Sequence, residues 1–221
     1  MVKPSAHTPE ALVIAPVTNA TRNAAFEFHR STLGEFMLPV PPAAFQQMVE
    51  ARQMVVVERQ GQVAGLCYVK PDGKELDAVP RWEFGGLHLA PGLRGRGLGT
   101  LLSAVAITAV TRADPKPVMG YVHQDNSAGM GLLVHSLGFV VTDQKVRLGP
   151  DDAPGHLRRD DAGFATAHVL RLPDAARARL SDGLEHIGLH LDIPGNHSGL
   201  FRRAPDLRSP SRSHPGQALP A

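Results

Sequence analysis

A turn of glycines and arginines is the part of the sequence best suited to chemistry. It lies between an apolar segment, "GGLHLA", and a leucine-rich one, and it contains Arg94, Gly95, Arg96, Gly97 and Gly99. Glycines let a ligand approach the backbone, and the N–H groups that begin a following helix favour negative charge. The two arginines add positive charge. The stretch therefore predicts a site for an anionic, phosphate-bearing ligand.

Two common phosphate-binding motifs do not fit this turn. The dinucleotide fingerprint G-x-G-x-x-G fails because Thr100 occupies the position of its third glycine. The Walker A loop fails because the sequence has no Gly-Lys-Ser/Thr. A pattern R-x-x-G-x-G does fit, as Arg94, Gly97 and Gly99. The structural alternative is a glycine turn needed only for tight packing of a strand against a helix.

The segment "GGLHLAPGLRGRGLGTLL" resembles the acyl-CoA-binding signature of the GCN5-related N-acetyltransferase (GNAT) superfamily. That signature pairs an L-x-V-x-P strand with a Q/R-x-x-G-x-G/A turn, and here Leu89 stands where valine is usual. A second signature of the family is an Asn that opens a helix ending in L-G-F. It is present as Asn126 followed by "LVHSLGF" at residues 133–139.

The resemblance implies that acetyl-CoA binds along this segment and donates its acyl group directly to an amine. Main-chain groups of the strand would hold the pantetheine arm, and a backbone N–H near Leu89 would stabilise the oxyanion. The turn would bind the pyrophosphate. Asn126 caps its helix, and its counterpart in the family often bonds the pantetheine. The residues expected to bind the donor are Leu87, His88, Leu89, Arg94, Gly95, Arg96, Gly97, Leu98, Gly99, Thr100 and Asn126.

Glu83 is the first candidate for the general base. It precedes Arg94 by eleven residues, a spacing similar to that of the base glutamate in histone-acetylating members. Partial burial would raise the pKa of its carboxyl group toward the working pH, although many members use an ordered water instead. His88 is a second candidate, but a regular strand would place it on the opposite face from Glu83. Both could share a face only if Gly85 and Gly86 form a bulge, so we expect His88 to be a core or surface histidine.

The general acid is where the sequence departs from the family. Many members have a tyrosine four residues before the glycine of L-G-F, aimed at the CoA sulfur. Here that residue is Val134, which cannot donate a proton. His135 is adjacent but points about 100° away around a helix. Tyr121, on the preceding strand, is the candidate substitute, and water is the alternative.

The remaining pattern predicts the elements that position these residues. Apolar or alternating runs predict strands at 11–18, 54–70 (a hairpin turning at Gly61), 81–90, 116–124, 139–148 and 163–172. Helical spacing and capping residues predict helices at 19–34 (capped by Asn19), 43–52, 98–112, 126–137 and 173–186. The order β-α-α-β-β-β-α-β-α-β-β predicts an α/β domain. The resemblance implies a mixed, mostly antiparallel central sheet of about seven strands, flanked by helices.

Domain boundaries follow from composition. We expect a GNAT-like acyltransferase domain over residues 1–175, a C-terminal extension over 176–200 and a disordered basic tail over 201–221. Four arginines and one aspartate give that tail a charge of +3, which leaves −1 for the rest of a chain whose net charge is +2. A nucleic-acid partner is therefore not expected.

Several other classes of protein are not expected from the composition. No segment approaches the ~20 apolar residues that span a membrane. The single cysteine, Cys67, excludes an internal disulfide and a Cys-rich zinc site, so we expect a packed thiol and a cytoplasmic location. His186 and His190 are four residues apart, but nothing marks a third ligand. We expect no metal site.

The sequence thus predicts an N-acyltransferase that moves an acetyl group from acetyl-CoA to a primary amine on a small molecule or a peptide. The alternative is an acyl-CoA-binding module without turnover, which Val134 favours. A nucleotide-binding protein using the same turn is a third reading. The sequence leaves open whether the chain forms a homodimer.

Overall fold

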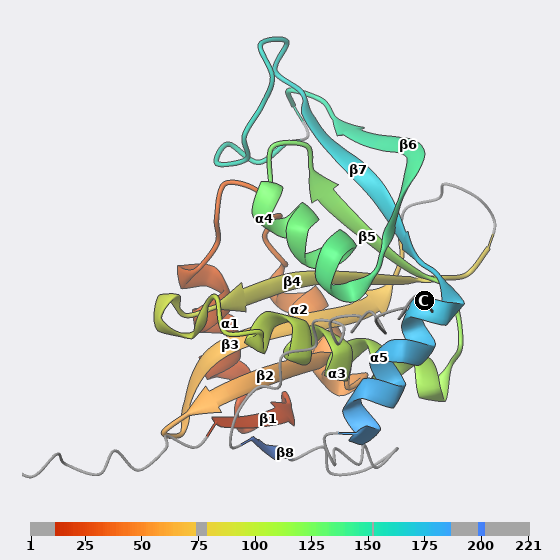
Figure 1. Ribbon diagram of the computed structural model, residues 1–221. Helices are drawn as coiled ribbons and strands as arrows, with labels where there is room; N and C mark the ends of the chain where they lie inside the picture. Colours follow the sequence, from red (N-terminus) through yellow and green to blue (C-terminus); the bar gives the residue numbers. More distant parts are fainter. Residues whose placement is uncertain (1–11, 74–78, 152, 187–198, 202–221) are drawn as a thin grey trace, which may run out of the picture.

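The apolar runs of the sequence become strands of one sheet, and the helices cover both of its faces (Figure 1). The computed structural model describes residues 12–73, 79–151, 153–186 and 199–201. In chain order the elements are β1 (Leu12–Pro16), α1 (Arg22–Ser31), α2 (Pro42–Glu50), β2 (Met54–Arg59), β3 (Gln62–Pro71), β4 (Trp82–Leu89), η1 (Pro91–Leu93), α3 (Leu98–Ala113), β5 (Val118–His123), α4 (Ser127–Met130), η2 (Gly131–Leu137), β6 (Val140–Leu148), β7 (Ala165–Leu172), α5 (Asp174–His186) and β8 (Gly199–Phe201).

The expected sheet is confirmed. Its strand order is β6-β7-β5-β4-β3-β2-β1-β8, and β4 with β5 is the parallel pair among antiparallel neighbours. Seven of these strands are those that the pattern predicts. The eighth, β8, joins the end of the expected extension to Phe201, the first residue of the expected disordered tail, and it pairs with β1 at the edge of the sheet.

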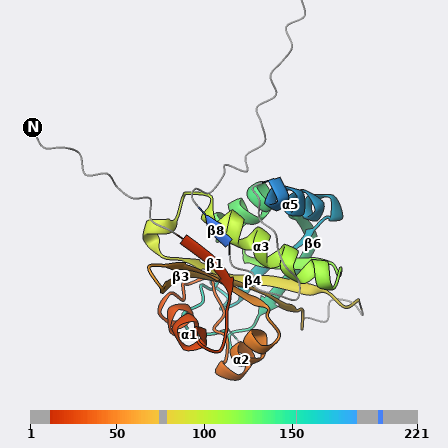
Figure 2. The same ribbon diagram turned by 90° about the horizontal axis from the view of Figure 1, so that it is seen from below.

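Two apolar layers hold the helices on the sheet. Helices α3 and α5 and the η2 segment pack on one face, and α1 and α2 pack on the other, as Figure 2 shows for α1, α2, α3 and α5. The valines of β2 and the apolar run of β3 are buried because both faces of these central strands are covered. Cys67 is fully buried there, and burial raises the pKa of its thiol. The expectation of a packed cysteine is confirmed.

Two helices differ from their predicted form. Asn19 does not cap α1, which begins at Arg22, because Thr18 and Thr21 exchange hydrogen bonds in a turn just before it. The helix predicted at 126–137 is one α-helical turn, α4, continued by the π-helical η2. Asn126 does cap it, and Gly138 does end it with φ +82°.

The C-terminal extension begins within α5. Ala176, Leu180 and Leu184 of this helix belong to the same buried cluster as α3, so the expected boundary at residue 175 falls inside a packed helix. His190 and most of the expected tail, residues 202–221, lie outside the described residues. In the part of the chain that is described, no helix is long and apolar enough to cross a membrane.

Candidate functional site

The site begins where β4 and β5 separate. These two strands pair at Trp82–Phe84 against Val118–Gly120 and then diverge, toward the left in Figure 1. A cavity of about 430 Å³ occupies the region beyond the last pair. Its walls include Gly85–Leu87 and Leu89 of β4 and Tyr121–His123 of β5. Asn126, which caps α4, and Gly129 and Leu132 of α4 and η2 also line it. The cavity also meets Arg94, so it extends to the glycine–arginine turn.

A β-bulge in β4 sets which side chains face the site. Tyr68 pairs with Gly85 and Leu66 pairs with His88, so β4 has one residue more than β3 across this stretch. Gly86 carries the distortion with φ +62°. The bulge places Glu83 and His88 on the same face of the sheet, the face that α1 and α2 cover. Gly85 and Gly86 therefore do form the bulge that the sequence-based prediction required for Glu83 and His88 to share a face.

Main-chain groups of β4 face the gap between the strands. The Ala90 N–H donates to the Ala64 carbonyl on β3, and alternation then directs Leu89 and Leu87 toward the opposite edge. The Leu89 carbonyl confirms this direction because it accepts a hydrogen bond from Arg94 Nε at 2.9 Å. The N–H groups of Leu87 and Leu89 thus point where an extended ligand would lie beside β4.

The glycine–arginine turn forms an open helix start. Gly95 and Gly97 have φ of +72° and +75°, and α3 begins immediately afterwards at Leu98. None of the described side chains caps this helix, and residues 94–97 are exposed. Free N–H groups at an uncapped helix terminus favour an anion. The turn leads directly into a helix start, as the sequence predicts. The phosphate-bearing ligand expected there stays a prediction.

Asn126 has a structural role that is separate from ligand binding. Its Oδ1 accepts a hydrogen bond from the Gly129 N–H at 2.8 Å, and its side chain also lines the cavity. We expect Asn126→Ala to lower the free energy of unfolding by about 1 kcal/mol. Asn126→Asp should restore stability because a carboxylate also caps. Acetyl-CoA affinity should fall in both variants, since the amide donor is lost. Urea unfolding and calorimetric titration separate the two effects, and an aspartate variant with wild-type affinity would limit Asn126 to capping.

Glu83 lies at the junction of two hollows. It lines the cavity between β4 and β5, and also a groove of about 560 Å³ between α2 and β3. Its side chain is 12% exposed, so the expected burial is confirmed. Lys70, directly opposite on β3, contacts the Glu83 carboxylate with Nζ at 2.8 Å. This ion pair was not predicted from the sequence.

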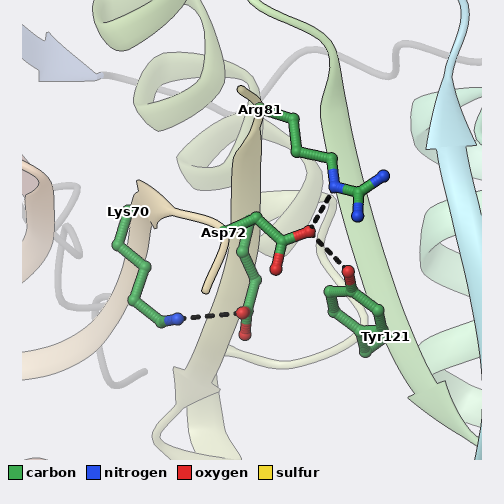
Figure 3. A network of polar contacts seen from close by, with 5 residues as sticks. Lys70, Asp72, Arg81 and Tyr121 are labelled. Atoms are coloured by element: carbon green, nitrogen blue, oxygen red, sulfur yellow. Dashed lines mark hydrogen bonds and ion pairs between the residues drawn. The ribbon is translucent and has the colours of Figure 1, made fainter. Parts of the chain in front are cut away.

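Tyr121 faces the same side of the sheet as Glu83 and points to a buried ion pair (Figure 3). Its hydroxyl donates to Asp72 Oδ2 at 2.5 Å, and Arg81 Nε contacts the same oxygen at 2.8 Å. Burial, and then the bond to Asp72, raise the pKa of Tyr121 well above its ordinary value. Tyr121 is therefore protonated, as an acid must be, but its proton is directed to Asp72.

The capped helix presents no ionisable side chain to the cavity between residues 127 and 137. Gly129, Leu132 and Leu133 line that wall, while Val134 packs on the core and His135 is exposed. The position at which the family often has tyrosine thus contributes packing. Among the described residues, no group of histidine, cysteine or carboxylate side chains is arranged to hold a metal.

A pair of buried histidines lies behind β4. The rings of His29 (α1) and His88 are 5.1 Å apart, and His88 Nδ1 contacts the Thr32 carbonyl. Within the described residues, His29 Nδ1 and His88 Nε2 have no hydrogen-bond partner. Burial chiefly, together with His29, lowers the pKa of His88 to about 4, and burial lowers that of His29. His88 is thus a core histidine. Its ring packs against α1, and the same alternation directs its main-chain groups toward β3, so its contact with the donor stays a prediction.

These histidines predict acid sensitivity of the fold. An unfolded histidine takes up a proton below about pH 6.5, whereas folded His88 stays neutral down to about pH 4. Stability should therefore fall as pH decreases through that window. The contribution of His88 between about pH 7.5 and 5 is roughly 2 kcal/mol. Urea midpoints should depend less on pH in His88→Gln than in wild type, and His135→Gln, at an exposed site, should behave as wild type. Equal pH dependence in all three proteins would refute this.

Two loops meet over the inner end of the cavity. The Arg158 N–H, in the β6–β7 connection, donates to the Glu35 carbonyl in the α1–α2 connection at 2.9 Å. His156 Nε2 contacts the Met37 carbonyl at 2.7 Å. Phe36 lies against the ring of His123, with centroids 5.1 Å apart. These contacts join the two connections, whose residues Phe36, Met37 and Leu157 line the cavity, and nothing in the sequence indicates them.

Comparison with known proteins identifies the chain's relatives. The profile of the Acetyltransferase (GNAT) family matches residues 20–139. In sequence, no curated protein gives a significant match. Among solved structures, the fold is similar to a GNAT-family acetyltransferase from Streptococcus pneumoniae, with 16% identity and a TM-score of 0.55, covering 72% of this chain and 97% of that one.

Two further structures have the same fold. A putative acetyltransferase from Salmonella typhimurium, solved with its cofactor acetyl-CoA, has 22% identity and a TM-score of 0.55, covering 73% of this chain and 92% of that one. Ribosomal-protein-alanine N-acetyltransferase from Brucella melitensis has 21% identity and a TM-score of 0.52, covering 72% of this chain and 97% of that one.

Proposed function

Since the chain belongs to the acetyltransferase (GNAT) family, we propose that it transfers an acetyl group from acetyl-CoA directly to a primary amine. The observation that carries the proposal is the continuous path from the open α3 terminus, along the free edge of β4, to Glu83. A donor with a diphosphate at one end and a reactive thioester at the other fits such a path.

Each part of the donor has a matching feature. The pyrophosphate would meet the N–H groups of residues 95–100 and the exposed Arg96 side chain. The pantetheine amides would bond the Leu87 and Leu89 main chain as an added strand does. One of these N–H groups would also stabilise the oxyanion that forms on the thioester carbonyl. Arg94 supports the turn through its bond to the Leu89 carbonyl.

The chemistry requires two proton movements. The amine nitrogen attacks the thioester carbon, the C–S bond breaks, and the amine proton passes to Glu83, directly or through water. The CoA thiolate leaves and takes a proton either from Tyr121 or from water. Water is favoured, because the Tyr121 hydroxyl is held by Asp72. The presence of Val134 where the family often has tyrosine therefore affects protonation of the leaving group and not donor binding.

The second candidate function is an acyl-CoA-binding module without turnover. The wall at residues 127–137, which offers no ionisable side chain to the cavity, is the observation in its favour. Calorimetric titration with acetyl-CoA tests the donor site, and lack of binding would refute both functions. Release of free thiol with a panel of amines then supports the transferase, whereas binding without release supports the module. Tighter binding of ATP than of CoA would instead indicate a nucleotide-binding protein.

A further inference from the structure

The ion pair between Lys70 and Glu83 lies where the acceptor must arrive. This inference rests on the proposed function, in which an amine approaches Glu83. The two side chains are cross-strand partners on β3 and β4, with Nζ and Oε2 2.8 Å apart. Figure 3 shows Lys70 beside the network of Asp72, Arg81 and Tyr121. An ammonium group that reaches Glu83 would therefore compete with the ammonium group of Lys70 for the same carboxylate.

Displacement would leave Lys70 in need of an anion. Its side chain is 29% exposed, so water only partly replaces the lost partner. The nearby carboxylate of Asp72 is fully buried and already binds Arg81 and Tyr121. A charge removed from its partner in a partly buried site is costly. An acceptor that brings a negative charge beside its amine would remove this cost.

A second hollow offers the acceptor a route to Glu83. Contacts between the α1–α2 and β6–β7 connections form part of the cavity wall near His156 and Arg158. The groove between α2 and β3 also reaches Glu83. Its walls are mainly apolar, with Leu38, Pro39, Val40, Pro41, Ala44, Met48 and Tyr68 among the lining residues. The body of the acceptor should therefore be apolar.

We propose that the acceptor is a free amino acid with an apolar side chain. Its ammonium group would replace Lys70 at Glu83, its carboxylate would bind Lys70, and its side chain would lie in the groove against Leu38 and Met48. The amine and the carboxylate of an amino acid are one carbon apart, so a single molecule can reach both Glu83 and Lys70, which are cross-strand neighbours. Lys70 is then a specificity residue: it binds the carboxylate of the acceptor, which leaves Glu83 available to the amine.

A matched panel of acceptors tests this assignment. Leucine, leucinamide, 3-methylbutylamine and a peptide beginning with leucine share one apolar side chain, and leucine alone has a carboxylate next to its amine. Wild type should acetylate leucine with kcat/KM about tenfold or more above the others, as expected for a charge-assisted contact. Lys70→Met should remove this preference without changing acetyl-CoA affinity. Lys145→Met, the same change at an exposed position on β6, should keep the preference.

The outcomes separate this proposal from the one it rests on. Equal or faster reaction of the amide, the amine or the peptide in wild type would overturn the amino-acid assignment while supporting amine acetylation. A preference that survives in Lys70→Met would remove Lys70 as its cause. Acetyl-CoA binding without thiol release from any acceptor would overturn the proposed function, and this inference with it. The wild-type panel decides the acceptor even if the Lys70 variant does not fold.

Discussion

Replacing Glu83 with glutamine is expected to lower kcat by about 100-fold or more, the usual contribution of a positioned general base. The amide keeps the size and position of the side chain but cannot accept the amine proton. Its acetyl-CoA affinity should match that of wild type, because the turn and the β4 edge are unchanged. Residual activity should rise with pH, since only acceptor molecules that already lack the extra proton can attack.

Initial rates of thiol release across pH, with calorimetric titration of acetyl-CoA, check this prediction. The matched control is Glu185→Gln. Glu185 also forms an ion pair, with Arg112, but it lies on α5 away from the cavity. The control should retain wild-type kcat. A Glu83→Gln variant with unchanged kcat would mean that water or another group accepts the proton.

Replacing Gly86 with alanine is expected to lower the free energy of unfolding by about 2–5 kcal/mol. The added Cβ would lie 2.1 Å from Tyr68 Cε1, and φ at this residue is +62°. Tyr68 is buried in the core under α1 and α2, so its ring can give way only by shifting toward the cavity or the groove that it lines. The alternative relief is loss of the bulge, which would turn Leu87 and Leu89 away from the gap. Acetyl-CoA affinity should therefore fall as well.

Gly61→Ala separates backbone strain from the steric clash. Gly61 has φ +73° in the β2–β3 turn, and nothing lies within 4 Å of an added Cβ. Its substitution should cost about 1 kcal/mol. In a double-mutant cycle, Tyr68→Leu should reduce the cost of Gly86→Ala. Equal urea midpoints for the Gly86 and Gly61 variants would show that the bulge tolerates a side chain.

Features of the site that depend on neighbouring residues in the chain were predictable. The glycine–arginine turn, the start of α3 at Leu98 and the Asn126 cap are each built within a few residues, so composition and spacing indicate them. The sequence indicated only that a bulge in β4 was possible, and that Glu83 and His88 would share a face if it formed. Two adjacent glycines permit it, but the pairing of Tyr68 with Gly85 and Leu66 with His88 produces it.

Features that join distant parts of the chain were not predictable. Lys70 lies opposite Glu83 because of the register of β3 and β4, whose connection is too long for turn geometry to set that register. The bond of Tyr121 to the Asp72–Arg81 pair joins the β3–β4 connection to β5, the strand that lies parallel to β4. The contact between the β6–β7 and α1–α2 connections joins residues more than one hundred positions apart.

The sequence by itself thus determined the donor half of this protein: its strand, turn and helix start, and through them its family. That half depends on local backbone conformation and on helix-terminus electrostatics, which short motifs encode. Only the tertiary structure decided the region that we propose binds the acceptor. The register of β3 and β4 placed Lys70 opposite Glu83, and the bulge placed Glu83 and His88 on the same face of the sheet. Contacts between two connections then formed part of the cavity wall. Those features arise from packing between segments far apart in the chain, for which no short motif exists.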